Sequence, residues 1–217
     1  MITIHHLVAS QSERIIWLME ELGLPYALKI YHRDPATFMA PAALREIHPI
    51  GQAPVIQDGD VRLAESLAIT HYILESYGGG RLCIRPGAPG YADYLYWLVY
   101  SIGGLMPQAI QIMISARMGG NQDDPRAAMI QERRSRHFRM IDARLSANEW
   151  LAGDTFTAAD IMCQFPFGTM SQFAPLDISN YLGIRRWLDR INDRPAFQRA
   201  MKVDTDALAA RRSHDVE

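Results

Sequence analysis

The sequence predicts an α/β domain at the amino terminus, followed by an all-helical domain. Three observations support this division. Short strand-like and helix-like patterns alternate over the first 80 residues, glycine and proline concentrate without periodicity in residues 81–89, and from residue 90 the apolar residues recur at helical spacing. We therefore expect domains at residues 1–80 and 90–203, a linker at 81–89, and a loose charged tail at 204–217.

The expected first domain begins with a strand in which Ile2, Ile4 and His6 alternate. A helical pattern follows from Ser10 and stops at Gly23, which suits a helix end. The remaining elements are a strand at 26–31, a short helix at 40–47, strands at 54–57 and 61–65 joined by an Asp-Gly turn, and a helix from Ser66. The order is therefore βαβ-α-ββα.

The expected second domain begins with a long helix over residues 91–118, which we expect to be interrupted at Gly103, Gly104 and Pro107. Further helices are predicted at about 125–146, 158–173, 180–193 and 195–201. Thr157 and Asp160 have the spacing of a capping box, in which each side chain accepts from the other residue's backbone amide. We interpret this pair as a folding element without catalytic role.

Composition excludes several classes of function. The 217 residues include 22 basic and 24 acidic residues, a net charge of −2, so no positive field favours nucleic acid or an anionic membrane as partner. The amino terminus lacks a signal-peptide pattern, and no apolar run approaches about 18 residues. The 7 histidines include no helical pair at metal-ligand spacing, and Cys83 and Cys163 are far apart, as suits the reducing cytoplasm. We therefore expect a cytoplasmic protein that binds no metal, nucleic acid or membrane.

Ser10 to Glu13 also fit a capping box, with Ser10 as the expected cap of the first helix. A structural role alone would explain this pattern. A hydroxyl between a strand and a helix amino terminus, however, also lies where backbone amides and the helix dipole stabilise an anion such as a thiolate.

Two further motifs lie beside expected strands. Pro54 stands at a strand start, where a cis bond after Ala53 would direct the Ala53 backbone toward a peptide-like ligand, although a trans proline at a strand edge is the commoner arrangement. Glu65 and Ser66 join the hairpin to the next helix. With Ser66 as the helix cap, the pair could hold the ammonium and carboxylate groups of an amino acid, or it could simply suit a helix start.

These motifs together resemble the soluble glutathione transferase family, in its serine-type, bacterial-like branch. The resemblance runs from Ile2 to about Met201. It is carried by Ser10 to Arg14 with Trp17 to Gly23, by Gly51 to Pro54, by Ala64 to Ser66 with Ala68-Ile69, by Gly153 to Ile161, and by Trp187-Leu188 through Arg194 to Phe197.

The family implies a thioredoxin-like first domain, a homodimer, and a detoxifying transferase that adds glutathione, its co-substrate, to small hydrophobic electrophiles and in some members reduces organic hydroperoxides. By resemblance, the bond before Pro54 is cis and Ala53 pairs with the cysteinyl backbone of glutathione. Glu65 and Ser66 then hold its γ-glutamyl end, and Gln52 approaches its glycyl part.

The catalytic residue in this family is a Tyr, Ser or Cys near the first helix. No Cys precedes Cys83 and no Tyr precedes Tyr26, which leaves Ser10, with Ser12 as the alternative. A free thiol with a pKa of about 8.5 is mostly protonated at neutral pH. A hydroxyl hydrogen bond together with helix amides could lower that pKa by about two, so neither a protein base nor a metal is required.

Residues for the electrophile are expected on the first long helix, where Tyr100, Met106 and Met113 could face a pocket or serve as core. Two other functions remain open. One is a non-catalytic glutathione-fold protein that binds a ligand or regulates a partner. The other is a glutathione-dependent isomerase, which is disfavoured because that branch usually has Ser-Ser-Cys where this chain has Ala9-Ser10-Gln11.

Overall fold

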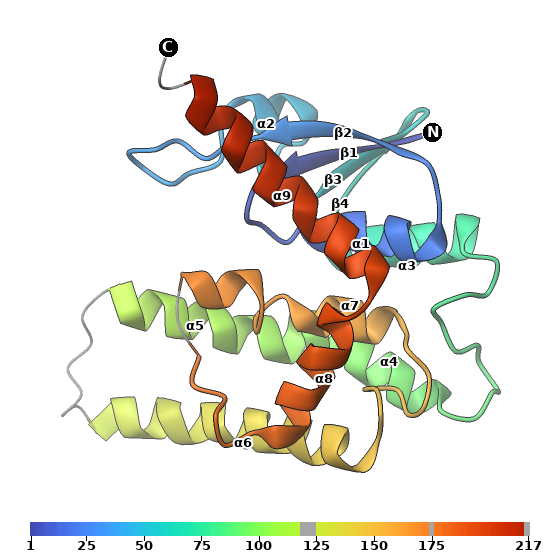
Figure 1. Ribbon diagram of the computed structural model, residues 1–217, viewed down its shortest axis with the longest axis vertical. Coiled ribbons are helices and arrows are strands. Elements are labelled where there is room, and N and C mark those ends of the chain that lie inside the picture. The colour runs from blue at the N-terminus through green and yellow to red at the C-terminus, as the bar shows by residue number, and fades with distance from the viewer. Residues whose placement is uncertain (118–124, 174–175, 215–217) are drawn as a thin grey trace. The chain divides into compact units, whose positions relative to one another are not determined.

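The computed structural model describes residues 1–117, 125–173 and 176–214 (Figure 1). The chain forms two compact units. One contains Met1–Arg81 together with Asn192–Glu217, and the other contains Leu82–Ile191. The first unit is therefore discontinuous in sequence, which the expected division into consecutive domains did not include.

The first unit is built on a four-stranded mixed sheet with strand order β2-β1-β3-β4. Its strands are β1 (Ile2–Leu7), β2 (Tyr26–Tyr31), β3 (Val55–Asp58) and β4 (Val61–Ala64). β1 runs parallel to β2 and antiparallel to β3, and β3 pairs with β4 in the expected hairpin. β1 is thus a central strand, and the segment that follows it leaves the middle of the sheet.

Four helices accompany this sheet: α1 (Glu13–Leu22), α2 (Ala43–Ile47), α3 (Ser66–Tyr77) and α9 (Pro195–His214). The apolar side chains of α1, including Ile15 and Leu18, are fully buried, as its helical spacing predicts. α1 ends at Gly23, which adopts the left-handed conformation with φ of 60° and returns its N–H to the carbonyls of the last turn.

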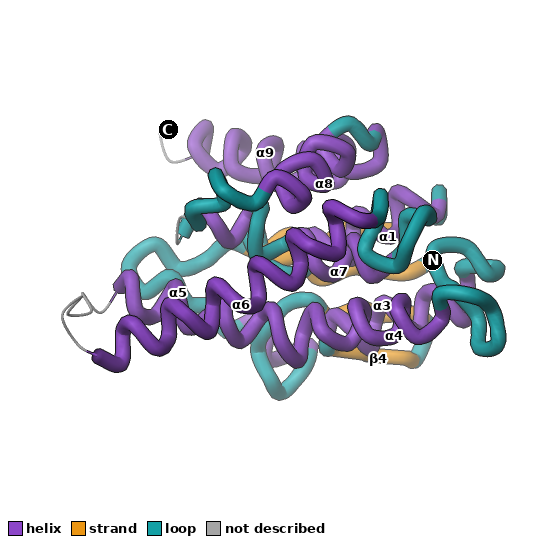
Figure 2. The backbone as a smooth tube through the Cα atoms, turned by 90° about the horizontal axis from the view of Figure 1, so that it is seen from below, coloured by secondary structure: helices purple, strands orange, loops and turns teal. Residues whose placement is uncertain are grey.

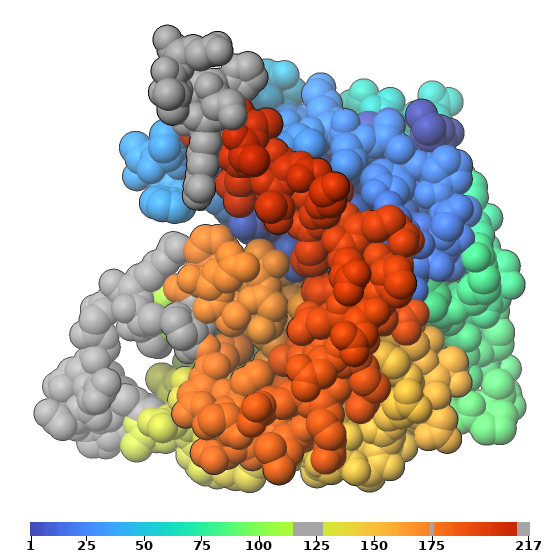
Figure 3. Space-filling view, viewed as in Figure 1, coloured from blue at the N-terminus to red at the C-terminus, as the bar shows by residue number. Residues whose placement is uncertain are grey.

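α9 joins the carboxy-terminal segment to the first unit by packing against α1. The rings of Trp17 and Phe197 meet edge to face with centroids 4.8 Å apart. The red atoms of α9 lie against the blue atoms of the amino-terminal segment in Figure 3. The expectation of a loose tail from residue 204 is wrong for residues 204–214, which continue α9. Residues 215–217 lie outside the described residues.

In the part of the second unit that the structure describes, all regular elements are helical (purple in Figure 2). They are α4 (Tyr91–Tyr100), a π-helical turn η1 (Ser101–Leu105), α5 (Met106–Arg117), α6 (Pro125–Ala147), α7 (Ala158–Gln164), a 3₁₀ turn η2 (Thr169–Gln172) and α8 (Leu182–Asn192). η1 contains Gly103 and Gly104, so the expected interruption of the long helix is present as a π-helical turn. The single helix expected at 158–173 is instead α7 followed by η2.

Asp160 organises the core of the second unit. The capping box with Thr157 is formed, as the sequence predicts. The Asp160 carboxylate also accepts hydrogen bonds from the Leu151 amide and the Trp187 indole, each at 3.0 Å. Burial raises the pKa of Asp160 to about 6, and these hydrogen bonds limit the rise.

One stretch in the described ranges, Tyr91–Ile114, is long and apolar enough to pass a test for a membrane-crossing helix based on length and composition alone. No such stretch was expected from the sequence. Core helices of soluble proteins pass the same test, and Trp97, Leu98 and Leu105 in this stretch are buried.

Candidate active site

A pocket in the first unit brings together two of the sequence motifs. It has a volume of about 330 Å³, including space open to solvent. The lining residues are Gln11, Ile50, Gln52, Ala53, Pro54, Ala64, Glu65 and Ser66. All five residues expected to bind glutathione therefore line one pocket, although ten positions separate the two motifs.

The loop before β3 supplies one side of this pocket. The Ala53-Pro54 peptide bond is cis, as the resemblance implied. Pro54 is buried, and Ala53 packs against a small cluster of Leu7, Tyr31 and Leu44. Gln52 is exposed at the pocket. The loop thus presents one polar side chain next to a backbone fixed by core contacts.

The start of α3 supplies the other side. Glu65, and not Ser66 as expected, occupies the cap position, and Ser66 is the first helical residue. Glu65 is exposed and has φ of 70°, a conformation that is uncommon for a residue with a side chain. Backbone strain of this kind often accompanies a binding site, because the fold maintains it to direct a side chain. Here it places an acidic side chain beside the nearly buried Ser66.

Ser10 lies in the loop between β1 and α1, but it does not cap the helix. α1 begins at Glu13, with Ser12 in the cap position and no side-chain capping bond, so the predicted capping box is wrong. The Ser10 hydroxyl instead lies 2.7 Å from the Ser12 hydroxyl and accepts from the Ser12 amide at 3.3 Å. Ser10 is 6% exposed, whereas Ser12 is fully buried. Of the two candidate serines, Ser10 is therefore the one that reaches the surface.

The first amides of α1 are already engaged. The N–H groups of Glu13, Arg14 and Ile15 donate to the carbonyls of Ser10, Gln11 and Ser12, respectively, at 3.1 to 3.3 Å. These amides close the turn that precedes the helix. An anion near Ser10 would therefore depend on the hydroxyl more than the helix-terminus argument from the sequence assumes.

The loop that carries Ser10 is held from both sides. Ala9 has φ of 54°, and its N–H donates to Asp204 Oδ2 at 2.8 Å. Its carbonyl accepts from Arg33 at 3.3 Å. Asp204 belongs to α9 and Arg33 to the segment after β2, so two distant parts of the chain fix the residue next to Ser10.

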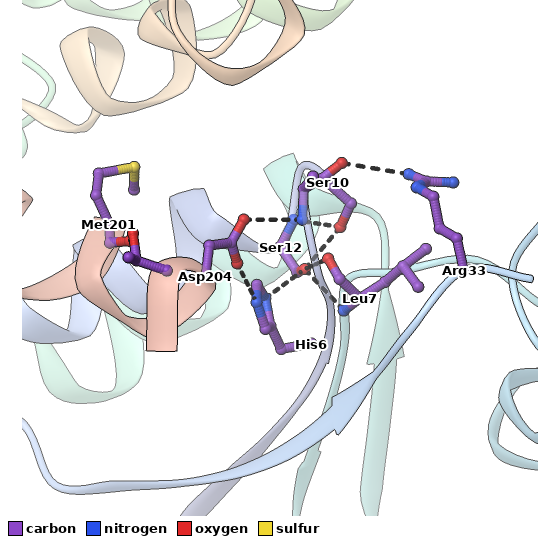
Figure 4. Close-up of polar contacts among 9 residues, drawn as sticks. His6, Leu7, Ser10, Ser12, Arg33, Met201 and Asp204 are labelled. Carbon is purple, nitrogen blue, oxygen red and sulfur yellow. Dashed lines mark hydrogen bonds and ion pairs between the residues drawn. The ribbon is translucent and has the colours of Figure 1, made fainter. Parts of the chain in front are cut away.

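A continuous chain of hydrogen bonds leads from Ser10 into the protein (Figure 4). The Ser12 hydroxyl lies 2.9 Å from His6 Nδ1. On the far side of the imidazole, His6 Nε2 lies 2.5 Å from Asp204 Oδ1. His6 is fully buried on β1, while Asp204 is 17% exposed on α9. The order of side chains is therefore Asp204, His6, Ser12, Ser10.

The residues expected to contact the electrophile lie in the second unit. Met106 is buried in a cluster with Ala109, Phe165 and Met170, and Met113 packs against that cluster. The Tyr100 hydroxyl lies 2.5 Å from His137 Nδ1, and burial raises the pKa of Tyr100. The structure thus brings Met106 and Met113 together and places Tyr100 on a histidine that the sequence analysis did not consider.

Sequence reasoning missed His6 and Asp204 as members of the site. His6 was taken only as a strand residue, and Asp204 was assigned to the loose tail. These residues are 198 positions apart, so no local spacing relates them. A polar residue at the buried carboxyl end of a central strand was the one available signal for His6.

Comparison with known proteins agrees with the fold. Residues 9–76 match the model of the glutathione S-transferase N-terminal domain, and residues 105–195 match that of the C-terminal domain. Glutathione S-transferase 3 of Schizosaccharomyces pombe is 31% identical, over 96% of this chain and 90% of the relative. A glutathione S-transferase structure from Actinobacillus pleuropneumoniae has a TM-score of 0.84 at 32% identity, covering 94% of this chain and 93% of that one.

A glutathione transferase from Phanerochaete chrysosporium, solved with oxidised glutathione, has a TM-score of 0.78 at 22% identity and covers 96% of both chains. The fold is that of a thioredoxin-like domain followed by a helical domain, the architecture of the transferases that use glutathione. The chain belongs to the glutathione S-transferase family, and its relatives support a glutathione transferase function. The sequence-based identification of the family and of its fold class is thereby confirmed.

Proposed function

We propose that the protein binds glutathione in the pocket of the first unit and uses Ser10 to hold its sulfur as a thiolate for attack on small hydrophobic electrophiles. The observation that carries this proposal is the convergence of Gln52, Ala53, Pro54, Glu65 and Ser66 on one pocket. Gln11, the neighbour of Ser10, lines the same pocket, so a ligand there has its other end close to the Ser10 loop.

Each part of glutathione has a chemical match in this arrangement. The exposed Glu65 carboxylate suits the ammonium group of the γ-glutamyl residue. The Ser66 hydroxyl and the amides at the start of α3 suit its carboxylate, because the positive end of the helix dipole lies there. The Ala53 backbone would pair with the cysteinyl residue as an added strand does, and Gln52 would approach the glycyl part.

The reaction class follows from the thiolate. A thiolate is a strong nucleophile, and its addition to an electrophilic carbon is the transferase reaction. We include reduction of organic hydroperoxides as a second activity of the same thiolate. Tyr100, Met106 and Met113 remain proposed contacts for the electrophile, although the burial of Met106 favours a core role for that residue.

The family also supports proposals about the state of the protein. We propose a homodimer in the cytoplasm, as is typical of soluble glutathione transferases. The two alternative functions, a non-catalytic binding protein and an isomerase, share the glutathione pocket. They differ from the proposal only in what happens after glutathione binds.

Glu65→Gln and Ser66→Ala test the glutathione pocket. Each should weaken glutathione binding about 10- to 100-fold, because one charge-assisted hydrogen bond contributes roughly 1.5 to 3 kcal/mol. Glu75→Gln, an exposed change elsewhere on α3, is the matched control and should bind normally. Affinity is measured by isothermal titration on folded variants. Unchanged affinity in both pocket variants would contradict the γ-glutamyl assignment.

Turnover then separates the alternatives. The wild-type protein should conjugate a generic aryl halide or reduce an organic hydroperoxide in the presence of glutathione. Retention on immobilised glutathione with neither activity would favour the non-catalytic alternative. Isomerisation of a maleyl-type cis double bond without conjugation would favour the isomerase.

A further inference from the structure

We propose that His6 is the proton acceptor for the glutathione thiol, reached through Ser12 and Ser10 and oriented by Asp204. This inference rests on the proposed function, because it assumes that the thiol meets Ser10. It adds a buried base to a site that the sequence analysis expected to work without one. The hydrogen-bond chain of Figure 4 is the observation that carries it.

The tautomer of His6 follows from its two partners. His6 Nε2 lies 2.5 Å from a carboxylate oxygen of Asp204, so Nε2 carries a proton and donates it. In the neutral ring, Nδ1 is then an acceptor. The Ser12 hydroxyl, which has one proton, lies 2.9 Å from Nδ1 and 3.3 Å from the Leu7 carbonyl oxygen, and we place the proton on the shorter contact, to Nδ1. Asp204 thus fixes the ring so that its free lone pair faces the two serines, a role comparable to that of the aspartate in a serine protease triad.

The positions of the two serine hydroxyl protons follow from the same count of donors and acceptors. Once Ser12 donates to His6, its oxygen accepts from the Leu7 amide at 3.2 Å and from the Ser10 hydroxyl at 2.7 Å. Ser10 donates its own proton to Ser12 and accepts from the Ser12 amide at 3.3 Å. A hydroxyl oxygen has two acceptor positions, so one lone pair of Ser10 is left for an incoming S–H group.

Proton transfer along this chain is balanced. The thiol proton passes to the Ser10 oxygen as the Ser10 proton passes to Ser12 and the Ser12 proton passes to His6 Nδ1. Three O–H or N–H bonds form and the S–H and two O–H bonds break. The products are a thiolate and an imidazolium paired with the Asp204 carboxylate. No atom other than hydrogen needs to move appreciably.

After proton transfer, the hydrogen bonds of this chain point in the opposite direction and stabilise the thiolate. After transfer, His6 donates to Ser12, Ser12 donates to Ser10, and Ser10 donates its remaining proton to the thiolate sulfur. The Ser10 hydroxyl therefore acts as acceptor before ionisation and as donor after it. Because the first amides of α1 are engaged in their own turn, this hydroxyl is the group in the loop that is poised to respond to the new charge.

The neighbouring charges are compatible with this role. Asp204 comes from α9, and its second oxygen holds the Ala9 amide at 2.8 Å, which keeps the carboxylate in place during transfer. Arg33 is bound to the carbonyls of Ala9 and Phe38, at 3.3 and 3.2 Å, respectively. The Arg33 guanidinium thus donates to carbonyls of the backbone beside the Ser10 loop.

A proton count tests the proposal directly. Glutathione is titrated calorimetrically into the protein at neutral pH, in two buffers of different ionisation enthalpy, to count the protons released on binding. S-methylglutathione, which has no thiol proton, is the matched ligand, and the difference between the two counts belongs to the thiol. Ultraviolet absorbance of the thiolate gives the amount formed in the same sample.

The wild-type protein should form the thiolate while releasing well under one proton for each thiolate, because the proton stays on His6. His6→Asn keeps a polar group near Ser12 but accepts no proton. Asp204→Asn presents an N–H to Nε2, which forces the ring proton onto Nδ1 and blocks transfer. Both variants should form less thiolate at neutral pH and conjugate about 10²-fold more slowly, a typical contribution of general base catalysis. Any thiolate they form should release a full proton.

One full proton released for each wild-type thiolate, with normal turnover, would overturn the relay and leave the proposed function standing. Absence of any thiolate or turnover in the wild-type protein would instead contradict the proposed function. The wild-type count decides the question even if a variant fails to fold. For variants that fold, thermal unfolding shows whether a loss of rate exceeds what a structural role of the histidine would explain.

Discussion

Arg194 and Glu21 form a two-point ion pair in which the guanidinium donates to both carboxylate oxygens, at 2.6 and 2.7 Å. Glu21 is only 8% exposed and also accepts from the Trp17 indole at 2.9 Å. This pair joins the start of α9 to the end of α1. The neighbouring ion pair between Arg199 and Glu20 is more exposed to solvent on both side chains.

Arg194→Ala should therefore destabilise the protein by about 2 to 3 kcal/mol, because it leaves a mostly buried carboxylate without its cation. Arg199→Ala is the matched control, since Arg199 is 56% exposed. It should cost less than about 1 kcal/mol. Urea unfolding of both variants measures the difference, and equal losses would show that burial does not distinguish the pairs.

Removal of the Asp160 side chain should cost more than the loss of a helix cap. Asp160→Ala leaves the buried amides of Leu151 and Thr157 and the Trp187 indole without their acceptor, so we expect a loss of about 3 kcal/mol or more. Thr157→Ala, which removes only a capping hydroxyl, should cost about 1 kcal/mol. Glutathione affinity of folded Asp160→Ala should stay near normal. Lost affinity with normal stability would reverse this assignment.

The raised pKa of Asp160 predicts a pH dependence of stability. Its folded-state pKa of about 6 exceeds the ordinary value of 3.8, so between these values the folded state binds more protons than the unfolded state. Burial of the charge therefore costs stability above pH 6, and this cost disappears as the pH falls toward 4. The free energy of unfolding of the wild type minus that of Asp160→Asn should rise by about 2 kcal/mol as the pH falls from 6 to 4. A flat difference would contradict the shift.

The two serines should differ in their response to substitution. Ser10→Ala should reduce turnover at neutral pH, with a smaller loss at high pH, where the thiol ionises unaided, and with little change in affinity. Ser12→Ala should reduce turnover similarly and also lower stability, because Ser12 is fully buried and serves the Leu7 amide. Steady-state kinetics across pH, beside thermal unfolding, distinguishes the two. A Ser10→Ala enzyme with unchanged kinetics would remove Ser10 from the mechanism.

The proposed homodimer is tested by sedimentation equilibrium. α4 exposes Leu95, Tyr96 and Val99, with 43 to 50% of each residue accessible, and such apolar side chains suit a contact between copies of the chain. Val99→Glu should weaken a dimer formed through this helix. A stable monomer of 24.5 kDa at micromolar concentration would contradict the dimer.

The fold was predictable wherever its signal was local. Alternating and helical spacing placed the four strands and α1, and the Asp-Gly turn placed the β3–β4 hairpin. Two helix caps were misplaced, because Ser10 and Ser66 have the composition of caps although Ser12 and Glu65 occupy the cap positions. The continuation of α9 was missed because its second half is charged and has few apolar residues. This half instead makes polar contacts to His6, Ala9 and Arg33, which are distant in sequence.

In the candidate site, too, the features that depend on local sequence were predictable and the contacts between distant segments were not. The residues of the pocket followed from motifs in which neighbours in sequence act together, such as Ala53-Pro54 and Glu65-Ser66. The network behind Ser10 depends on a contact between β1 and α9 that only the folded chain creates. The spacing of the capping residues also could not show that the first amides of α1 donate to carbonyls of the preceding turn.

The discontinuity of the first unit has a consequence for how the protein matures on the ribosome. The strands of the sheet are synthesised before Leu82–Ile191, and α9 emerges only after both. His6 therefore gains its contact with Asp204 only after the whole of Leu82–Ile191 has been synthesised. A prematurely terminated chain would contain both pocket motifs and Ser10, yet it would lack the carboxylate that orients the imidazole. With the proposed relay, the order of synthesis therefore completes the glutathione pocket before the group that orients the base.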